Sequence, residues 1–195
     1  MHPYTLYPIS QLPALLKDLK VELLNHLFEP CETLSAFILQ NVLRDNPKFS
    51  SYDDLIEAIR TKLLTFLENS EKEAVKNGKP LNPDISKIIA AHPRLGPSKE
   101  SKTTNLSEHS SAEQRSLNSG SKEDAEKLLI LNEKYEATFP GLRYVVFVNG
   151  RTRASIMENM EERIARNDLH KEREEAFNAM CDIAHDRSRK LSPRL

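Results

Sequence analysis

Apolar residues recur every three or four positions along most of the chain, which is the spacing of amphipathic helices. The pattern predicts eight helices, over about residues 12–27, 32–44, 51–68, 84–91, 111–118, 121–139, 151–164 and 169–190. Their apolar stripes are typical of helix faces that pack against a core. We therefore predict an all-α fold, with residues 1–195 forming a single domain.

Three segments depart from the helical pattern. Residues 69–83 are polar and contain one glycine and two prolines, which predicts a loop. From residue 97 the composition turns to Ser, Lys, Asn and Glu, which predicts a mobile loop before the short helix. Tyr144–Val148 has strand-like residues but no apparent partner strand, so we predict an extended segment near residues 143–148 that crosses the core.

Composition and charge exclude several functions. The net charge is -1, so we expect no nucleic acid and no anionic membrane surface as a partner. No apolar run approaches the roughly 18 residues of a membrane span. The two cysteines, Cys31 and Cys181, lie far apart and have no metal-binding spacing, so we interpret both as reduced thiols.

A histidine, a glutamate and an arginine, each able to take part in catalysis, occupy positions that suggest a site. His92 precedes Pro93, which predicts that it ends a helix and projects into a loop-lined space. Ser110 and Glu113 have the spacing of a capping box. Arg187 continues the apolar face of the last helix, where an unpaired charge would be costly. Each also has a purely structural interpretation: a helix-end histidine, a capping glutamate and a core ion pair.

Taken together, the motifs resemble a known family. The chain contains His92-Pro93-x-Leu95-Gly96, Ser110-x-x-Glu113-Gln114, Leu131-Asn132-x-x-Tyr135 with Phe139, Tyr144-Val145-Val146-Phe147-Val148, and Glu162-Arg163-Ile164 before Arg187. In this order and spacing they resemble the 2-oxo-4-hydroxy-4-carboxy-5-ureidoimidazoline (OHCU) decarboxylases of urate breakdown. The resemblance runs from about residue 12 to residue 191. Two departures are an arginine, Arg94, at a commonly acidic position, and a rearranged segment before Tyr144 that is one residue longer.

The resemblance implies a cofactor-independent and metal-free reaction that converts OHCU to (S)-allantoin. It implies His92 as proton donor, Glu113 as the residue that orients His92 or binds ring donors, and Arg187 as a planar fork for a carboxylate or ring oxygen. It further implies that the substrate is bound by Pro93, Ser110, Gln114, Tyr144, Val146 and Val148, the last three through the backbone. The small ureidoimidazoline is then the expected partner, and a homodimer is compatible with the sequence.

Several alternatives stay open at this point. The enzyme could act on a related ureido compound, or the chain could be a helical interaction module that kept the fold alone. A metal hydrolase built on His92, His109 and His185 is a poorer fit, because no pair has helical i, i+4 spacing. The ending Pro193-Arg194-Leu195 resembles a weak peroxisomal address, and otherwise indicates an ordinary terminus of a cytoplasmic protein.

Overall fold

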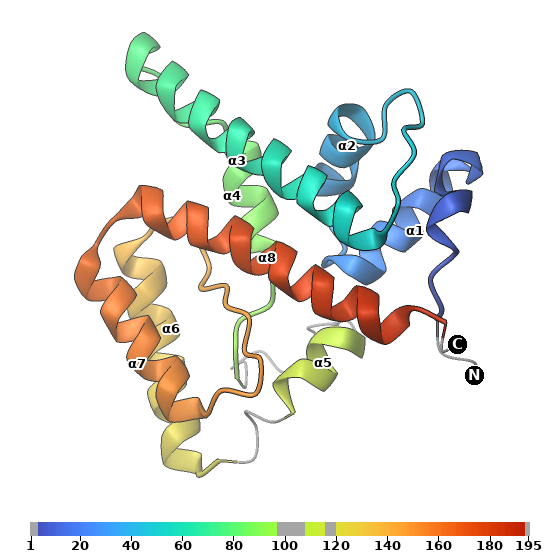
Figure 1. Ribbon diagram of the computed structural model, residues 1–195. Coiled ribbons are helices and arrows are strands. Elements are labelled where there is room, and N and C mark those ends of the chain that lie inside the picture. The colour runs from blue at the N-terminus through green and yellow to red at the C-terminus, as the bar shows by residue number, and fades with distance from the viewer. Residues whose placement is uncertain (1–3, 97–107, 116–119, 194–195) are drawn as a thin grey trace.

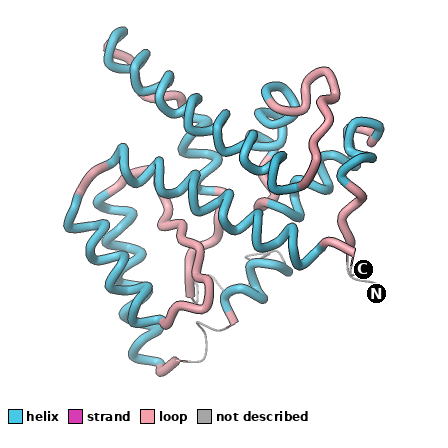
Figure 2. The backbone as a smooth tube through the Cα atoms, in the orientation of Figure 1, coloured by secondary structure: helices cyan, strands magenta, loops and turns pink. Residues whose placement is uncertain are grey.

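The fold is all-α, as the hydrophobic pattern predicts (Figure 1). A computed structural model describes residues 4–96, 108–115 and 120–193. Within these ranges it contains a 3₁₀ helix, Ile9–Ala14, and the α-helices α1 (Lys17–Leu27), α2 (Glu32–Asn41), α3 (Tyr52–Asn77), α4 (Pro83–Ala90), α5 (Glu108–Gln114), α6 (Lys122–Thr138), α7 (Arg153–Arg166) and α8 (Leu169–Leu191). No β-strand occurs in this part of the chain (Figure 2).

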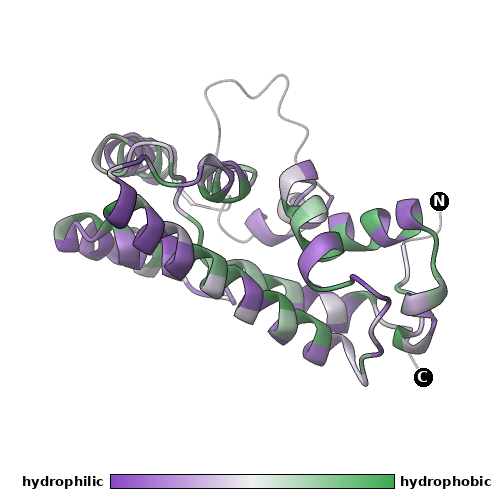
Figure 3. Cartoon of the chain, turned by 90° about the horizontal axis from the view of Figure 1, so that it is seen from above, coloured by the Kyte–Doolittle hydropathy of each residue, from purple (hydrophilic) through white to green (hydrophobic). Residues whose placement is uncertain are grey.

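Helix α8 organises the other elements. It packs against α1, α3 and α4, while α6 and α7 pack against each other beside its N-terminal end (Figure 1). Its face toward the core includes Phe177, Met180 and Ala184, all 1% exposed or less. Apolar and polar faces are separated around the long helices (Figure 3), so burial of the apolar faces fixes how the helices pack. Arg187 lies on this buried face of α8.

Side chains cap the first turns of several helices. Ser51 Oγ accepts a hydrogen bond from the amide of Asp54 at 3.0 Å, and Ser121 Oγ accepts one from Asp124 at 3.1 Å. Asn82 caps α4 in the same way, with Pro83 in the first turn. Each cap satisfies a backbone amide that the first helical turn leaves without an intrahelical partner.

The predicted first helix is interrupted near its start. Leu12 belongs to the 3₁₀ helix, and the backbone is extended at Leu15 and Leu16 before α1 begins. Leu12 is buried and Leu15 packs against the core, while Leu16, in the extended link before α1, is 74% exposed. Leu16 therefore does not belong to the buried stripe that the sequence predicts.

The loop predicted over residues 69–83 is wrong for most of its length. Helix α3 continues to Asn77 and ends at Gly78, whose φ of +60° suits the left-handed end of a helix. The segment is rich in Lys and Glu, which are good helix formers, and Lys72 pairs with Glu68 one turn earlier. It has no long apolar stripe because this end of α3 extends beyond the other helices (Figure 1).

The extended segment is present: residues 142–148, which follow α6 and precede α7 in the sequence, run beside these two helices without secondary structure (Figure 2). Arginines hold several of its carbonyl oxygens. Arg163 Nη1 donates to Val145 O at 3.0 Å, and Arg151 donates to Phe147 O at 2.5 Å and to Val148 O at 3.2 Å. The segment is thus held by side chains in place of a partner strand.

The first described segment contacts the end of α8, where the amide of Leu6 donates to Leu191 O at 2.9 Å. Arg194 and Leu195, on which the predicted peroxisomal address depends, lie outside the described residues, as does most of the loop predicted from residue 97. Among the helices of the described ranges, none is long and apolar enough to cross a membrane.

Candidate active site

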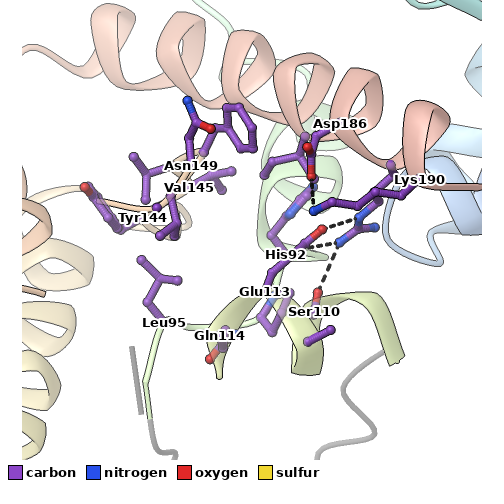
Figure 4. A pocket seen from close by; sticks show the side chains of 18 residues that line it. His92, Leu95, Ser110, Glu113, Gln114, Tyr144, Val145, Asn149, Asp186 and Lys190 are labelled. Carbon is purple, nitrogen blue, oxygen red and sulfur yellow. Dashed lines mark hydrogen bonds and ion pairs between the residues drawn. The ribbon is translucent and has the colours of Figure 1, made fainter. Parts of the chain in front are cut away.

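A cavity of about 290 Å³ lies between α5, α8, the end of α4 and the extended segment. Figure 4 shows α8 on one side, α5 opposite it, and the extended segment closing the end. All nine residues that the resemblance implies line this cavity: His92, Pro93, Ser110, Glu113, Gln114, Tyr144, Val146, Val148 and Arg187. They come from four separate parts of the sequence, and the fold brings them together.

His92 enters the cavity immediately after α4. The helix ends at Ala90, and the amide of His92 still bonds to Ile89 O at 3.2 Å, so the proline that follows does not displace it. The side chain is 6% exposed, and its Nε2 atom has no hydrogen-bond partner within the described residues. A buried polar atom without a partner costs free energy, which makes Nε2 a natural contact for a ligand.

Arg187 is the centre of a buried ionic cluster. Its Nε and Nη2 atoms each donate to Glu113 at 2.8 Å, in the bidentate geometry of an arginine–carboxylate pair. Nη2 also donates to Glu29 Oε1 at 2.8 Å and to Ser110 Oγ at 3.4 Å. The remaining nitrogen, Nη1, is buried and has no partner within the described part of the chain. Arg187 is therefore part of a core ion pair, and it also lines the cavity with one donor that has no partner in this part of the chain.

The capping box predicted for Ser110 and Glu113 is wrong. Helix α5 begins at Glu108, so Ser110 lies inside it, and Glu113 lies near its end. Ser110 Oγ donates to Glu29, and Glu113 binds Arg187. The three-residue spacing still matters, because it puts both side chains on the helix face that meets α8.

Glu29 is the site residue that the sequence did not reveal. It follows α1 in the loop before α2, is 5% exposed, and binds Arg187. Burial alone would raise its pKa, but the charge of Arg187 and the hydrogen bond from Ser110 outweigh burial and hold the pKa below its ordinary value. The only local signal was an acidic residue directly after the apolar Leu27-Phe28, which is too common to identify a site.

The loop that carries His92 is held from several directions. Gln114 donates to Arg94 O at 3.2 Å and accepts from the amide of Gly96 at 3.1 Å, so it ties α5 to this loop. Asn132 on α6 donates to Leu95 O at 3.0 Å. Arg143 Nη1 donates to His92 O at 2.9 Å. The Leu131-Asn132 motif thus acts on the site through the backbone next to His92.

Arg94, which replaces a commonly acidic residue, does not line the cavity. It makes a bidentate contact with Glu136 on α6, with distances of 2.7 and 2.5 Å. Glu136 in turn lies 3.9 Å from Arg143 Nε. The substitution therefore affects how the His92 loop is attached to α6 and adds no charge to the cavity.

The extended segment contributes backbone groups to the cavity wall. None of the amides from Tyr144 to Val148 has a hydrogen-bond partner within the described residues, while Arg151 and Arg163 occupy three of the carbonyl oxygens. The Tyr144 hydroxyl donates to Asn159 Oδ1 at 2.6 Å on α7, so the side chain points away from the cavity (Figure 4). Free amides in this wall suit a ligand rich in carbonyl oxygens.

A second buried cluster supports this wall. Arg163 pairs with Glu172 at 2.7 Å, and the Tyr135 hydroxyl donates to the same carboxylate at 2.5 Å. Arg163 also donates to the Val145 carbonyl oxygen. The Tyr135 and Glu162-Arg163-Ile164 motifs therefore fix the position of the extended segment, with no contact to the cavity from Tyr135 itself.

The structure separates the three histidines of the metal-hydrolase alternative. His109 Nε2 lies 3.0 Å from His26 Nδ1, and neither residue lines the cavity. His185 is held between Asp53 and Glu57, at 2.6 and 2.7 Å. Neither shares a site with His92, and no group of three His, Cys, Asp or Glu side chains suited to a metal ion occurs among the described residues.

Fold and site together define an all-α protein with a partly open cavity that is lined by a buried imidazole and a buried guanidinium. The chain belongs to the OHCU decarboxylase family, whose sequence pattern it matches over residues 13–189. A comparison with curated proteins found no match. Family membership supports a decarboxylase role in urate degradation, in agreement with the resemblance seen in the motifs.

Burial makes stability depend on the protonation of His92. Desolvation lowers the pKa of His92 to about 4, although the charge of Glu29 opposes this. The unfolded chain binds a proton near pH 6.5 and the folded chain does not, so stability is full above pH 6.5 and falls as the pH drops toward 4. We expect a loss of roughly 2 kcal/mol from this residue between pH 7 and pH 5.

Urea unfolding of wild type and His92→Asn at both pH values checks this prediction. The variant lacks the titrating group, so its stability should fall by roughly 2 kcal/mol less than that of wild type. The other histidines are common to both proteins and cancel in the comparison. An equal loss in the two proteins would show that His92 titrates normally in the folded state.

Proposed function

We propose that this protein decarboxylates OHCU and yields (S)-allantoin. The observation that carries the proposal is a pair of buried nitrogens, His92 Nε2 and Arg187 Nη1, that have no hydrogen-bond partner among the described residues and belong to residues that line the same cavity. The substrate is a small ring with a carboxylate, a hydroxyl and a ureido group, and it can satisfy both nitrogens as well as the free amides of the extended segment.

The chemistry needs no electron source beyond the substrate. The bond to the carboxylate breaks, carbon dioxide leaves, and the electron pair moves toward the adjacent ring C=N group, whose nitrogen takes up a proton from solvent. The hydroxyl then becomes a carbonyl as a proton is added to one face of the neighbouring carbon. The protein has to orient the ring and control this last proton transfer.

The low pKa of His92 changes the role that the sequence implied. With a pKa of about 4, the imidazole is neutral in the free protein near pH 7, so it starts as a base. In the proposed reaction it takes the proton of the substrate hydroxyl and returns a proton to the carbon that becomes the stereocentre. One imidazole nitrogen of His92 thus first accepts and then donates the proton. Because the bound substrate ring is held in one orientation, the proton reaches only one face of the new stereocentre.

Arg187 and its partners orient the ring. Its free Nη1 donor binds a ring or ureido oxygen, while Glu113 and Glu29 hold the guanidinium plane in place. Glu113 is 26% exposed, so its carboxylate also accepts a hydrogen bond from a ring N–H group in the proposed complex. Because Glu113 and Glu29 already hold the Arg187 side chain in place, the site needs little rearrangement when the substrate binds.

The direct test supplies freshly prepared OHCU to the purified protein and follows optical activity by circular dichroism. OHCU also decays unaided, but that decay gives racemic allantoin with no net signal. We expect a dichroic signal of the (S) product that appears faster than spontaneous decay and scales with protein concentration. Racemic product at the spontaneous rate would refute the proposed function.

A further inference from the structure

The cavity poses an electrostatic problem for an anionic substrate. Glu29 and Glu113 both pair with Arg187, so two carboxylates already hold its Nε and Nη2 atoms. His92 adds no positive charge near neutral pH. A carboxylate that approached Arg187 would therefore meet two carboxylates already bound to it, and like charges at short range oppose binding.

Lys190 is a second cation at the cavity. It lines the cavity on α8, three residues after Arg187, and its side chain is 65% exposed (Figure 4). Its Nζ atom is 2.5 Å from Asp186 Oδ2, one turn earlier, and Asp186 lines the cavity as well. Unlike Arg187, Lys190 has one carboxylate partner within the described residues, and that pair is open to solvent.

We propose that Lys190 binds the carboxylate of the incoming substrate and so distinguishes substrate from product. This inference rests on the proposed function and adds a specificity residue to it. An exposed lysine–aspartate pair on a helix contributes little stability, so the flexible side chain exchanges Asp186 for the substrate carboxylate at small cost. Loss of carbon dioxide removes the carboxylate, and Lys190 then returns to Asp186.

The proposal predicts different effects on substrate and product. In Lys190→Met the KM for OHCU should rise roughly 3- to 30-fold, and kcat should change much less. The inhibition constant of allantoin, which lacks the carboxylate, should stay within twofold of wild type. Lys190→Arg keeps the charge and should restore most of the affinity for OHCU.

Lys72→Met is the matched control. Lys72 also contacts an acidic residue four positions earlier at 2.5 Å and is 70% exposed, but it lies on α3 away from the cavity. Its kinetics should equal those of wild type. An unchanged KM in Lys190→Met, or an equal loss of affinity for OHCU and allantoin, would overturn the role of Lys190. Both results require an active wild type, so they are distinct from failure of the proposed function.

Discussion

Replacing His92 with Asn should lower the rate of (S)-allantoin formation by roughly 10²- to 10⁴-fold while the protein stays folded. General acid–base groups contribute rate factors of this size. The structural cost should be small, because His92 Nε2 makes no hydrogen bond within the described residues and the loop is held through the backbone. Stereospecific product formation, followed by circular dichroism, should fall to near the spontaneous background.

A histidine outside the cavity provides the control. His170 lies near the start of α8 and pairs with Glu71 on α3, and its side chain is 53% exposed. His170→Asn should keep the wild-type rate. If His92→Asn retained a rate within a few-fold of wild type, with (S) product still in excess, His92 could not be the group that moves the proton.

Replacing Arg187 with Ala should remove activity and also destabilise the fold by roughly 3–5 kcal/mol. The substitution leaves two carboxylates, Glu29 at 5% and Glu113 at 26% exposure, without their shared cation. A buried carboxylate that loses its cation is costly, and this cost dominates the effect. For a chain of this length the melting temperature should fall by roughly 6–20 °C. Calorimetry and the circular dichroism assay measure the two effects separately.

Arg60→Ala is the informative comparison for stability. Arg60 on α3 pairs with Asp182 on α8 and with Glu57 on its own helix, but these carboxylates are 49% and 54% exposed and can be hydrated when the arginine is lost. That variant should lose only about 1 kcal/mol. Equal losses in Arg187→Ala and Arg60→Ala would contradict the view that the Glu29–Arg187–Glu113 cluster is a buried ionic core.

Arg187→Lys separates charge from geometry at the same position. Lysine keeps the positive charge that the two carboxylates need, so most of the stability should remain. Lysine lacks the planar guanidinium, in which Nε and Nη2 bind Glu113 while Nη1 remains available as a further donor. We therefore expect kcat/KM to fall roughly 10- to 1,000-fold with a much smaller change in melting temperature.

The sequence by itself determined the all-α class, most of the helices and the set of candidate residues that line the cavity. Helical periodicity, the Ser51 and Ser121 caps and the proline after His92 depend on neighbours within one or two turns, so they can be read from the sequence. The motifs selected residues that the fold brings into one cavity, although their chemical roles stay predictions. Helicity after residue 69 was missed because a solvated helix end needs no apolar stripe.

The tertiary structure alone decided how the charges of the site are paired. Glu29 and Arg187 are 158 residues apart, and no local pattern could indicate that they share a hydrogen bond. The same spacing of Ser110 and Glu113 fits a helix cap or a helix face, and only the approach of α8 settles which one forms. Burial of His92, which sets its pKa and makes it neutral, likewise follows from packing around the loop. Local sequence determines which side chains a helix presents, whereas pairing and desolvation depend on the elements that pack against it.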